Sequence, residues 1–76
     1  CGRCKMMAPE LTQVAGEGTG HWLVAKVNTE ALPGLAQRFG ISAIPTLVLL
    51  RAGREVARQA GAMPAARIRQ FLQQAA

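Results

Sequence analysis

The hydrophobic residues near the start of the chain repeat with the period of a helix. Between residues 2 and 15, Met7, Leu11 and Val14 have the spacing i, i+4, i+7, which places them on one face. Pro9 lies inside this stretch and should kink the helix or divide it into two pieces, because proline lacks a backbone donor and crowds the preceding turn. The residues expected to end the helix are Gly16, Gly18 and Gly20.

Two later stretches predict helices with the same period. The apolar positions of the first, spaced i, i+3, i+4, i+7, are Leu32, Leu35, Ala36 and Phe39. Pro33 suits the first turn of this short helix, where no backbone donor is required, and Gly40 suits a left-handed residue at its end. Pro64 should open the last helix. Its apolar face consists of Ile68, Phe71, Leu72 and Ala75, and its polar face of Arg67, Arg69, Gln70 and Gln73.

The hydrophobic pattern between these helices is typical of β-strands. Residues 22–27 form a mostly apolar run with β-branched members, which predicts a buried strand. Residues 46–50 predict a second buried strand. Residues 52–53 mark a turn, and the alternation over 55–58 is that of an edge strand, so the last two strands should form a hairpin.

The resulting order is helix, strand, helix, strand, strand, helix, which predicts an α/β fold in one domain over residues 1–76. Three strands are few for a sheet with helices before, between and after them, because the apolar strand faces need more partners than this chain supplies. The chain also begins at Cys1 rather than at methionine. We therefore expect a partial domain that lacks segments upstream of Cys1.

Composition and charge argue against two classes of partner. No unbroken apolar run is longer than that from Leu47 to Leu50, far short of the roughly 20 residues that cross a bilayer. Nine Lys and Arg residues against four acidic residues give a net charge of +5, but the aromatic residues that could stack on bases fall at strand or apolar helix positions. We therefore expect neither a membrane nor a nucleic-acid partner.

The strongest chemical signal is the motif Cys1-Gly2-Arg3-Cys4 at the start of the first predicted helix. One helical turn brings the two sulfurs together in a reversible disulfide, and the helix N-terminus favours the thiolate of the first cysteine. Cys1 would attack a substrate disulfide, and Cys4, which lies further into the helix and is more buried, would resolve the mixed disulfide. The motif predicts thiol–disulfide exchange.

Two other interpretations of the cysteine pair remain open. It could be half of a zinc site, although a structural zinc site takes four ligands and only His21 could join the two cysteines. It could also be an inert pair in the core, which is unfavourable at the first turn of a helix beside glycine and arginine. Two cysteines in a motif of catalytic type fit a reducing cytoplasm better than a secreted, disulfide-stabilised fold.

Five separated stretches of the chain carry a family resemblance: residues 1–9, 24–30, 39–41, 44–47 and 61–62. They resemble the thioredoxin family, and most closely its bacterial thioredoxin 2 branch. The resemblance extends over essentially the whole chain, starting at the active-site cysteine. It implies a thioredoxin-like fold that is incomplete, lacking the N-terminal strand, the first helix and the central strand.

The resemblance also implies roles for individual residues. Cys1 matches the nucleophile and Cys4 the resolving thiol, with no cofactor or metal besides their redox-active disulfide. Pro45 matches a proline whose preceding peptide bond is cis, which would turn the Ile44 backbone toward the sulfurs to pair with an extended substrate. The residues that would complete this docking groove are Ala60, Gly61 and Ala62. An ordinary trans turn before Pro45, and a role for Gly61 as a strand terminator only, are the alternatives.

The chain departs from the family at Arg3, where proline is commonest. Its guanidinium should stabilise the Cys1 thiolate, so Gly2 and Arg3, the residues between the cysteines, are expected to tune the redox potential. Lys26 matches the usual partner of a buried acid that precedes the first cysteine in the family. Without that acid, Lys26 should be solvated.

These observations predict a protein-disulfide reductase whose partners are disulfide-containing proteins and a thioredoxin reductase. The competing hypothesis is a catalytically impaired fragment or binding module that is active only with its missing N-terminal segment. Such a module could also self-associate through exposed sheet edges. A basic nucleic-acid binder, with strongly salt-dependent binding, is a third and less favoured hypothesis.

Overall fold

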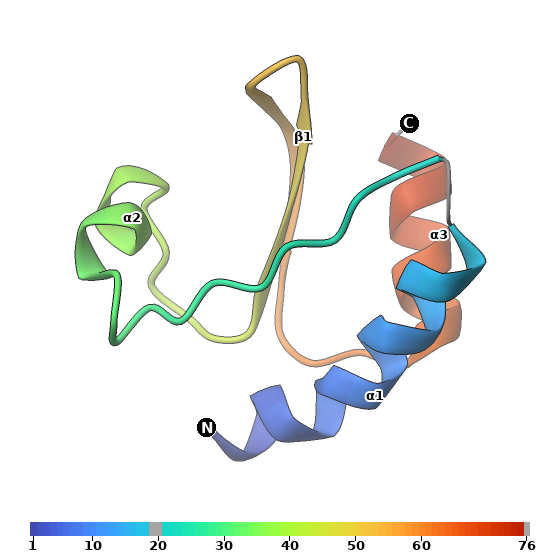
Figure 1. Cartoon of the computed structure of the whole chain (residues 1–76), viewed down its shortest axis with the longest axis horizontal. Coiled ribbons are helices and arrows are strands. Elements are labelled where there is room, and N and C mark those ends of the chain that lie inside the picture. Colours follow the sequence, from blue (N-terminus) through green and yellow to red (C-terminus); the bar gives the residue numbers. More distant parts are fainter. Residues whose placement is uncertain (19–20, 76) are drawn as a thin grey trace.

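The computed structural model describes residues 1–18 and 21–75, which form three helices and one β-hairpin. In chain order the elements are α1 (Gly2–Glu17), α2 (Pro33–Arg38), β1 (Thr46–Arg51), β2 (Arg54–Ala60) and α3 (Ala65–Ala75). Figure 1 shows α1 and α3 side by side, with the hairpin between them and α2. The predicted α/β class is confirmed.

The strand predicted at residues 22–27 is wrong. Residues 22–28 run as extended chain between α1 and α2 (Figure 1), and the sheet of the described residues contains β1 and β2 alone. A strand requires a neighbour that takes up its backbone hydrogen bonds, and no described segment pairs with this one. The apolar side chains are consequently open to solvent: Leu23 is 95% exposed and Val27 is 47% exposed.

Helix α1 is continuous through Pro9, so it is not divided into two pieces. Its ribbon bends along its length in Figure 1. Near the proline, the Thr12 hydroxyl donates to the Ala8 carbonyl at 3.0 Å, a side-chain bond to the preceding turn. Of the glycines expected to end the helix, Gly18 does so by donating its N–H to the Val14 carbonyl at 3.0 Å. The other two are Gly16, within the helix, and Gly20, outside the described residues.

The start and end of α2 and the start of α3 follow the predicted pattern. Pro33 is the first residue of α2, and Gly40 has a φ of 64°, the left-handed conformation expected after a helix end. The carbonyl of Pro64 accepts from the N–H groups of Arg67 and Ile68 at 3.0 and 3.1 Å, so Pro64 directly precedes the first residue of α3.

Arg58 of β2 connects the hairpin to the end of α2. Its Nη2 donates to the carbonyl of Phe39 at 2.5 Å and to Oε1 of Glu55 at 2.6 Å. The hydrogen bond from Arg58 holds the pKa of Glu55 below its ordinary value. α2 is thus tied to the sheet by a backbone carbonyl as well as by the chain.

The core lies between α1 and α3. Its buried side chains are Met7, Val14, Ala65 and Ile68. The partly buried residues that pack against them are Leu11, Trp22, Leu47, Met63 and Leu72. The helix faces predicted from the sequence, Met7 with Val14 and Ile68 with Leu72, are the faces that meet.

Trp22 packs on this core from the extended segment. Its indole ring lies against Gly18, so closely that a Cβ at that position would collide with the ring. The indole Nε1 is buried and has no hydrogen-bond partner among the described residues. A larger residue at position 18 would therefore force the indole ring to move from this place on the core.

The hairpin turns at Ala52 and Gly53, as predicted. β1 and β2 are antiparallel, with Arg51 opposite Arg54 and an irregularity in the register between Leu49 and Leu50. Both turn residues have positive φ, 54° at Ala52 and 78° at Gly53, as in a type I′ turn. Alanine at the first position is unusual, because its Cβ disfavours this conformation.

Replacing Ala52 by asparagine should stabilise the hairpin, because asparagine tolerates the left-handed region better and is favoured at this turn position. We expect the free energy of unfolding, measured by urea denaturation, to rise by about 0.5–1 kcal/mol. Ala52→Val, which places a β-branched residue at the same φ, is the control and should lower it. Equal values for the two variants would contradict this account of the turn.

Candidate redox-active site

The cysteine motif forms the first turn of α1. Cys1 is the N-cap residue, and its Sγ accepts a hydrogen bond from the N–H of Cys4 at 3.2 Å. The carbonyl of Cys1 accepts from the N–H of Lys5, also at 3.2 Å, which begins the helical hydrogen bonding. The Cys1 sulfur therefore lies where backbone N–H groups and the helix dipole stabilise negative charge.

The two sulfurs are joined in a disulfide, with the Cα atoms 5.3 Å apart. That separation is ordinary for a disulfide. Cys1 is exposed and Cys4 is half-buried, which confirms the predicted difference in burial. The described residues contain no free cysteine. An approaching thiol or disulfide thus reaches the Cys1 sulfur more readily.

Two positively charged residues, Arg3 and Lys5, lie close to the disulfide in sequence. Gly2, Arg3 and Lys5 are exposed, and the first turn of α1 contains no acidic side chain. The guanidinium and ammonium groups are separated from Cys1 by two and four positions and add to the field of the helix N-terminus. Because these groups are solvated, salt weakens their effect.

The peptide bond between Ile44 and Pro45 is cis, as the family resemblance implies, so the alternative of an ordinary trans turn is excluded. The Ile44 side chain is 48% exposed. The hydroxyl of Thr46 donates to the Ala43 carbonyl at 2.5 Å, and the Pro45 carbonyl accepts from the N–H of Gly61 at 2.9 Å. The bend before β1 is therefore held from both sides.

The structure brings together the two segments predicted to dock a substrate. Thr46 lies opposite Ala60 in the sheet register, and the hydrogen bond from Gly61 continues this pairing to Pro45. Gly61 has a φ of 97°, a conformation that strongly favours glycine. Ala60 and Ala62 on either side of it are exposed.

A hollow of about 260 Å³ lies between α1 and the loop that precedes α3. It is lined by Met6, Met7, Glu10, Ala62, Met63 and Pro64. All three methionines of the chain line it, and their flexible thioether side chains can adapt to different apolar shapes. Because Ala62 belongs to the predicted docking segment, the hollow connects that segment with the cysteine helix.

Sequence reasoning missed Met6, Glu10 and Met63. Helical spacing indicated Met7 as a core residue, but no pattern in the sequence places α1 beside the loop before α3. The sequence shows that the chain has three methionines, but only the tertiary fold brings Met63 to the same hollow as the two methionines of α1.

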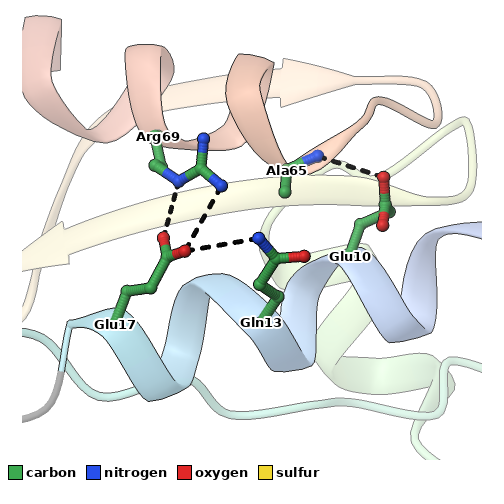
Figure 2. Close-up of polar contacts among 5 residues, drawn as sticks. All are labelled: Glu10, Gln13, Glu17, Ala65 and Arg69. Carbon is green, nitrogen blue, oxygen red and sulfur yellow. Dashed lines mark hydrogen bonds and ion pairs between the residues drawn. The ribbon is translucent and has the colours of Figure 1, made fainter.

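Polar contacts fix α1 against α3 (Figure 2). Oε1 of Glu10 accepts from the N–H of Ala65 at 3.3 Å. Further along α1, Glu17 pairs with Arg69 through two contacts of 2.6 and 3.3 Å, and Gln13 donates to Glu17 at 3.3 Å. The hydrogen bond from Arg69 holds the pKa of Glu17 below its ordinary value, and the same bond raises the pKa of Arg69.

The remaining predicted positions are solvated. Lys26 is exposed, as expected for a lysine without its buried acid, and His21 is exposed as well. Within residues 1–18 and 21–75, no group of three His, Cys, Asp or Glu side chains could hold a metal ion. In the same part of the chain, no helix is long and apolar enough to span a membrane.

The structure thus combines a disulfide at a helix N-terminus with a cis-proline bend before an antiparallel strand. The thioredoxin family model matches residues 1–74. Thioredoxin C-3 of Corynebacterium nephridii is 46% identical over 74 residues, covering 97% of this chain and 50% of that protein. A thioredoxin of Haemophilus influenzae is 39% identical over 74 residues, which cover 97% of this chain and 69% of that protein.

A solved structure agrees with these sequence matches. The germline-specific thioredoxin Deadhead of Drosophila melanogaster superposes with a TM-score of 0.90 at 27% identity, covering 97% of this chain and 70% of that one. The chain belongs to the thioredoxin family. It spans about half the length of thioredoxin C-3, and its thioredoxin-like fold is incomplete compared with the full one.

The ion pair between Glu17 and Arg69 should make stability depend on pH. Because the pKa of Glu17 is lowered in the folded chain, its contribution is present above the ordinary value near 4.5 and is lost as pH falls through the folded value. In urea denaturation, the difference in unfolding free energy between the parent and Glu17→Gln should shrink below about pH 4.5. Glu30→Gln, outside the helix pair, is the control. A difference that does not change between pH 7 and pH 3 would contradict this role.

Proposed function

We propose that this chain is the redox-active part of a protein-disulfide reductase of the thioredoxin type. The observation that carries the proposal is the Cys1 sulfur, which is exposed at the N-terminus of α1, accepts a backbone N–H, and is bonded to the more buried Cys4. The helix N-terminus stabilises the thiolate form of a cysteine at such a position, and a second thiol three residues away can then resolve a mixed disulfide.

The reaction proceeds in two displacements. In the reduced chain, the Cys1 thiolate attacks one sulfur of a substrate disulfide, forms a mixed disulfide and releases the other substrate sulfur as a thiolate. Cys4 then loses its proton and attacks the Cys1 sulfur, which breaks the mixed disulfide and releases the second substrate thiol. The substrate gains two electrons, and the chain ends with the Cys1–Cys4 disulfide seen in the structure.

Substrate binding is assigned to the two segments beside Pro45. The backbone of Ile44, an exposed residue, would pair with an extended stretch of the substrate in the manner of an added strand. The residues that complete this surface are Ala60, Gly61 and Ala62. The hydrogen bond from Gly61 to Pro45 supports the assignment, since it holds both segments in one place.

Further parts of the proposal concern the partners. A thioredoxin reductase would return the disulfide to the dithiol, and no cofactor besides the Cys1–Cys4 pair is required of this chain. We place the protein in the cytoplasm, on the argument that two cysteines in a catalytic-type motif fit a reducing compartment. The closer relation to the bacterial thioredoxin 2 branch stays a prediction.

A second candidate is a binding module that becomes active only when a further segment completes its sheet. The exposed side chains of Leu23 and Val27, together with a sheet that has two strands among the described residues, favour it. Such a module would self-associate through its open strand edges. Reduction of insulin disulfides distinguishes the candidates, because a module of this kind gives no turnover until the segment is supplied.

Cysteine variants test the proposed mechanism. With dithiothreitol or a thioredoxin reductase as electron donor, Cys1→Ser should abolish insulin reduction, because it removes the nucleophile. Cys4→Ser should also stop turnover but accumulate a mixed disulfide at Cys1, detected by mass spectrometry under non-reducing conditions. The assigned roles would be reversed if a mixed disulfide formed on Cys4 in the Cys1→Ser variant and none formed on Cys1 in the Cys4→Ser variant.

Arg3 should make the disulfide more oxidising, because its charge stabilises the reduced thiolate. We expect Arg3→Pro to lower the reduction potential by roughly 30 mV or less, since 30 mV corresponds to about 1.4 kcal/mol and the guanidinium is solvated. Equilibration with glutathione measures the potential. Arg3→Lys keeps the charge and is the control, with a potential near that of the parent. An unchanged or more oxidising Arg3→Pro variant would contradict this role.

A further inference from the structure

Helix α3 begins without a capping side chain from its own sequence. The residues before its second turn, 61–66, include no Ser, Thr, Asp or Asn, and the first turn contains no acidic residue. The backbone N–H groups at a helix start have no acceptor within the helix, and a local side-chain oxygen usually provides one. Pro64, which directly precedes α3, has no side-chain acceptor to offer.

Glu10 supplies that acceptor from a different helix. Its carboxylate, partly buried on α1, accepts the N–H of Ala65 at 3.3 Å across 55 positions of sequence (Figure 2). A negative charge at a helix N-terminus is also favoured by the helix dipole. α3 therefore receives both a cap and a compensating charge from the helix that begins at the cysteine motif.

The same contact fixes one end of residues 61–64, called the docking segment below because they include the docking residues Gly61 and Ala62. At its other end, Gly61 donates its N–H to the Pro45 carbonyl at 2.9 Å. The intervening residues, Ala62 to Pro64, line the hollow against α1. Residues 61–65 thus span from the cis-proline bend to the cysteine helix, with a hydrogen bond at each end.

We propose that Glu10 is a positioning residue for substrate recognition: it holds the segment 61–64 at a fixed place relative to Cys1. The proposal rests on the function proposed above. Glu10 follows Cys1 by nine positions, roughly 13 Å along the helix axis, and acts on the docking segment rather than on the sulfurs. Its loss impairs the binding of a protein disulfide and leaves the exchange chemistry intact.

Glu17 provides a matched control. It lies on the same helix and also contacts α3, through Arg69, but two turns further from the cysteines and from the docking segment. Removing either carboxylate weakens the contact between α1 and α3. Of these two carboxylates, only that of Glu10 accepts from Ala65, the residue directly after the docking segment.

The test compares Glu10→Ala, Glu10→Gln and Glu17→Ala on two substrates, insulin and the small neutral disulfide of 2-mercaptoethanol. We expect Glu10→Ala to raise KM for insulin about fivefold, which corresponds to the net free energy of one ordinary hydrogen bond. Its kcat, and its rate with the small disulfide, should stay at the parent's values. Glu10→Gln keeps an amide oxygen as acceptor, so its KM for insulin should lie close to that of the parent. Glu17→Ala should leave the KM for insulin unchanged.

Amide hydrogen exchange measures the same effect without turnover. In Glu10→Ala, the N–H groups of Gly61 and Ala65 should exchange faster than in Glu17→Ala. If the parent chain reduces neither substrate, the proposed function is refuted, and the hydrogen-exchange comparison still tests the positioning role. The positioning role is overturned if Glu10→Ala and Glu17→Ala loosen Gly61 equally. It is also overturned if both variants raise KM to the same extent, or if Glu10→Ala slows the small disulfide as much as insulin.

Discussion

The contact between α1 and α3 is the interaction on which the rest of the described structure depends. It contains the buried side chains Met7, Val14, Ala65 and Ile68, two from each helix, and the hairpin adds Leu47 at its edge. Full burial of a side chain as large as Ile68 contributes roughly 1.5–3 kcal/mol. Since the buried positions on α1 begin at Met7, the turn with the two cysteines extends beyond the core. The reactive end of the helix is exposed, and the rest of the helix is anchored.

Much of this arrangement follows from local sequence. The apolar faces of α1 and α3 and the turn at 52–53 depend on residues close together in the chain, so periodicity and turn chemistry predict them correctly. The segment 22–27 has an equally clear pattern and forms no strand. Its pattern describes a side-chain preference, whereas a strand is a property of two paired segments. A single sequence window cannot supply the partner.

The candidate site divides in the same way. The motif from Cys1 to Cys4 is readable from spacing, and the cis bond before Pro45 follows from the family resemblance. Glu10 could not be found in this way, because a lone glutamate on a helix is ordinarily a solvated residue. Its partner, the N–H of Ala65, is a backbone group, and backbone groups leave no trace in residue identity. Contacts of this kind become visible only when the helices are placed.

The packing of Trp22 has a consequence for following this protein in solution. It is the only tryptophan of the chain, and the chain contains no tyrosine. Its indole lies on the core beside Gly18, at the opposite end of α1 from the disulfide. Quenching by a disulfide acts over short distances, so the emission of this tryptophan reports on the packing of the core between α1 and α3 rather than on the disulfide.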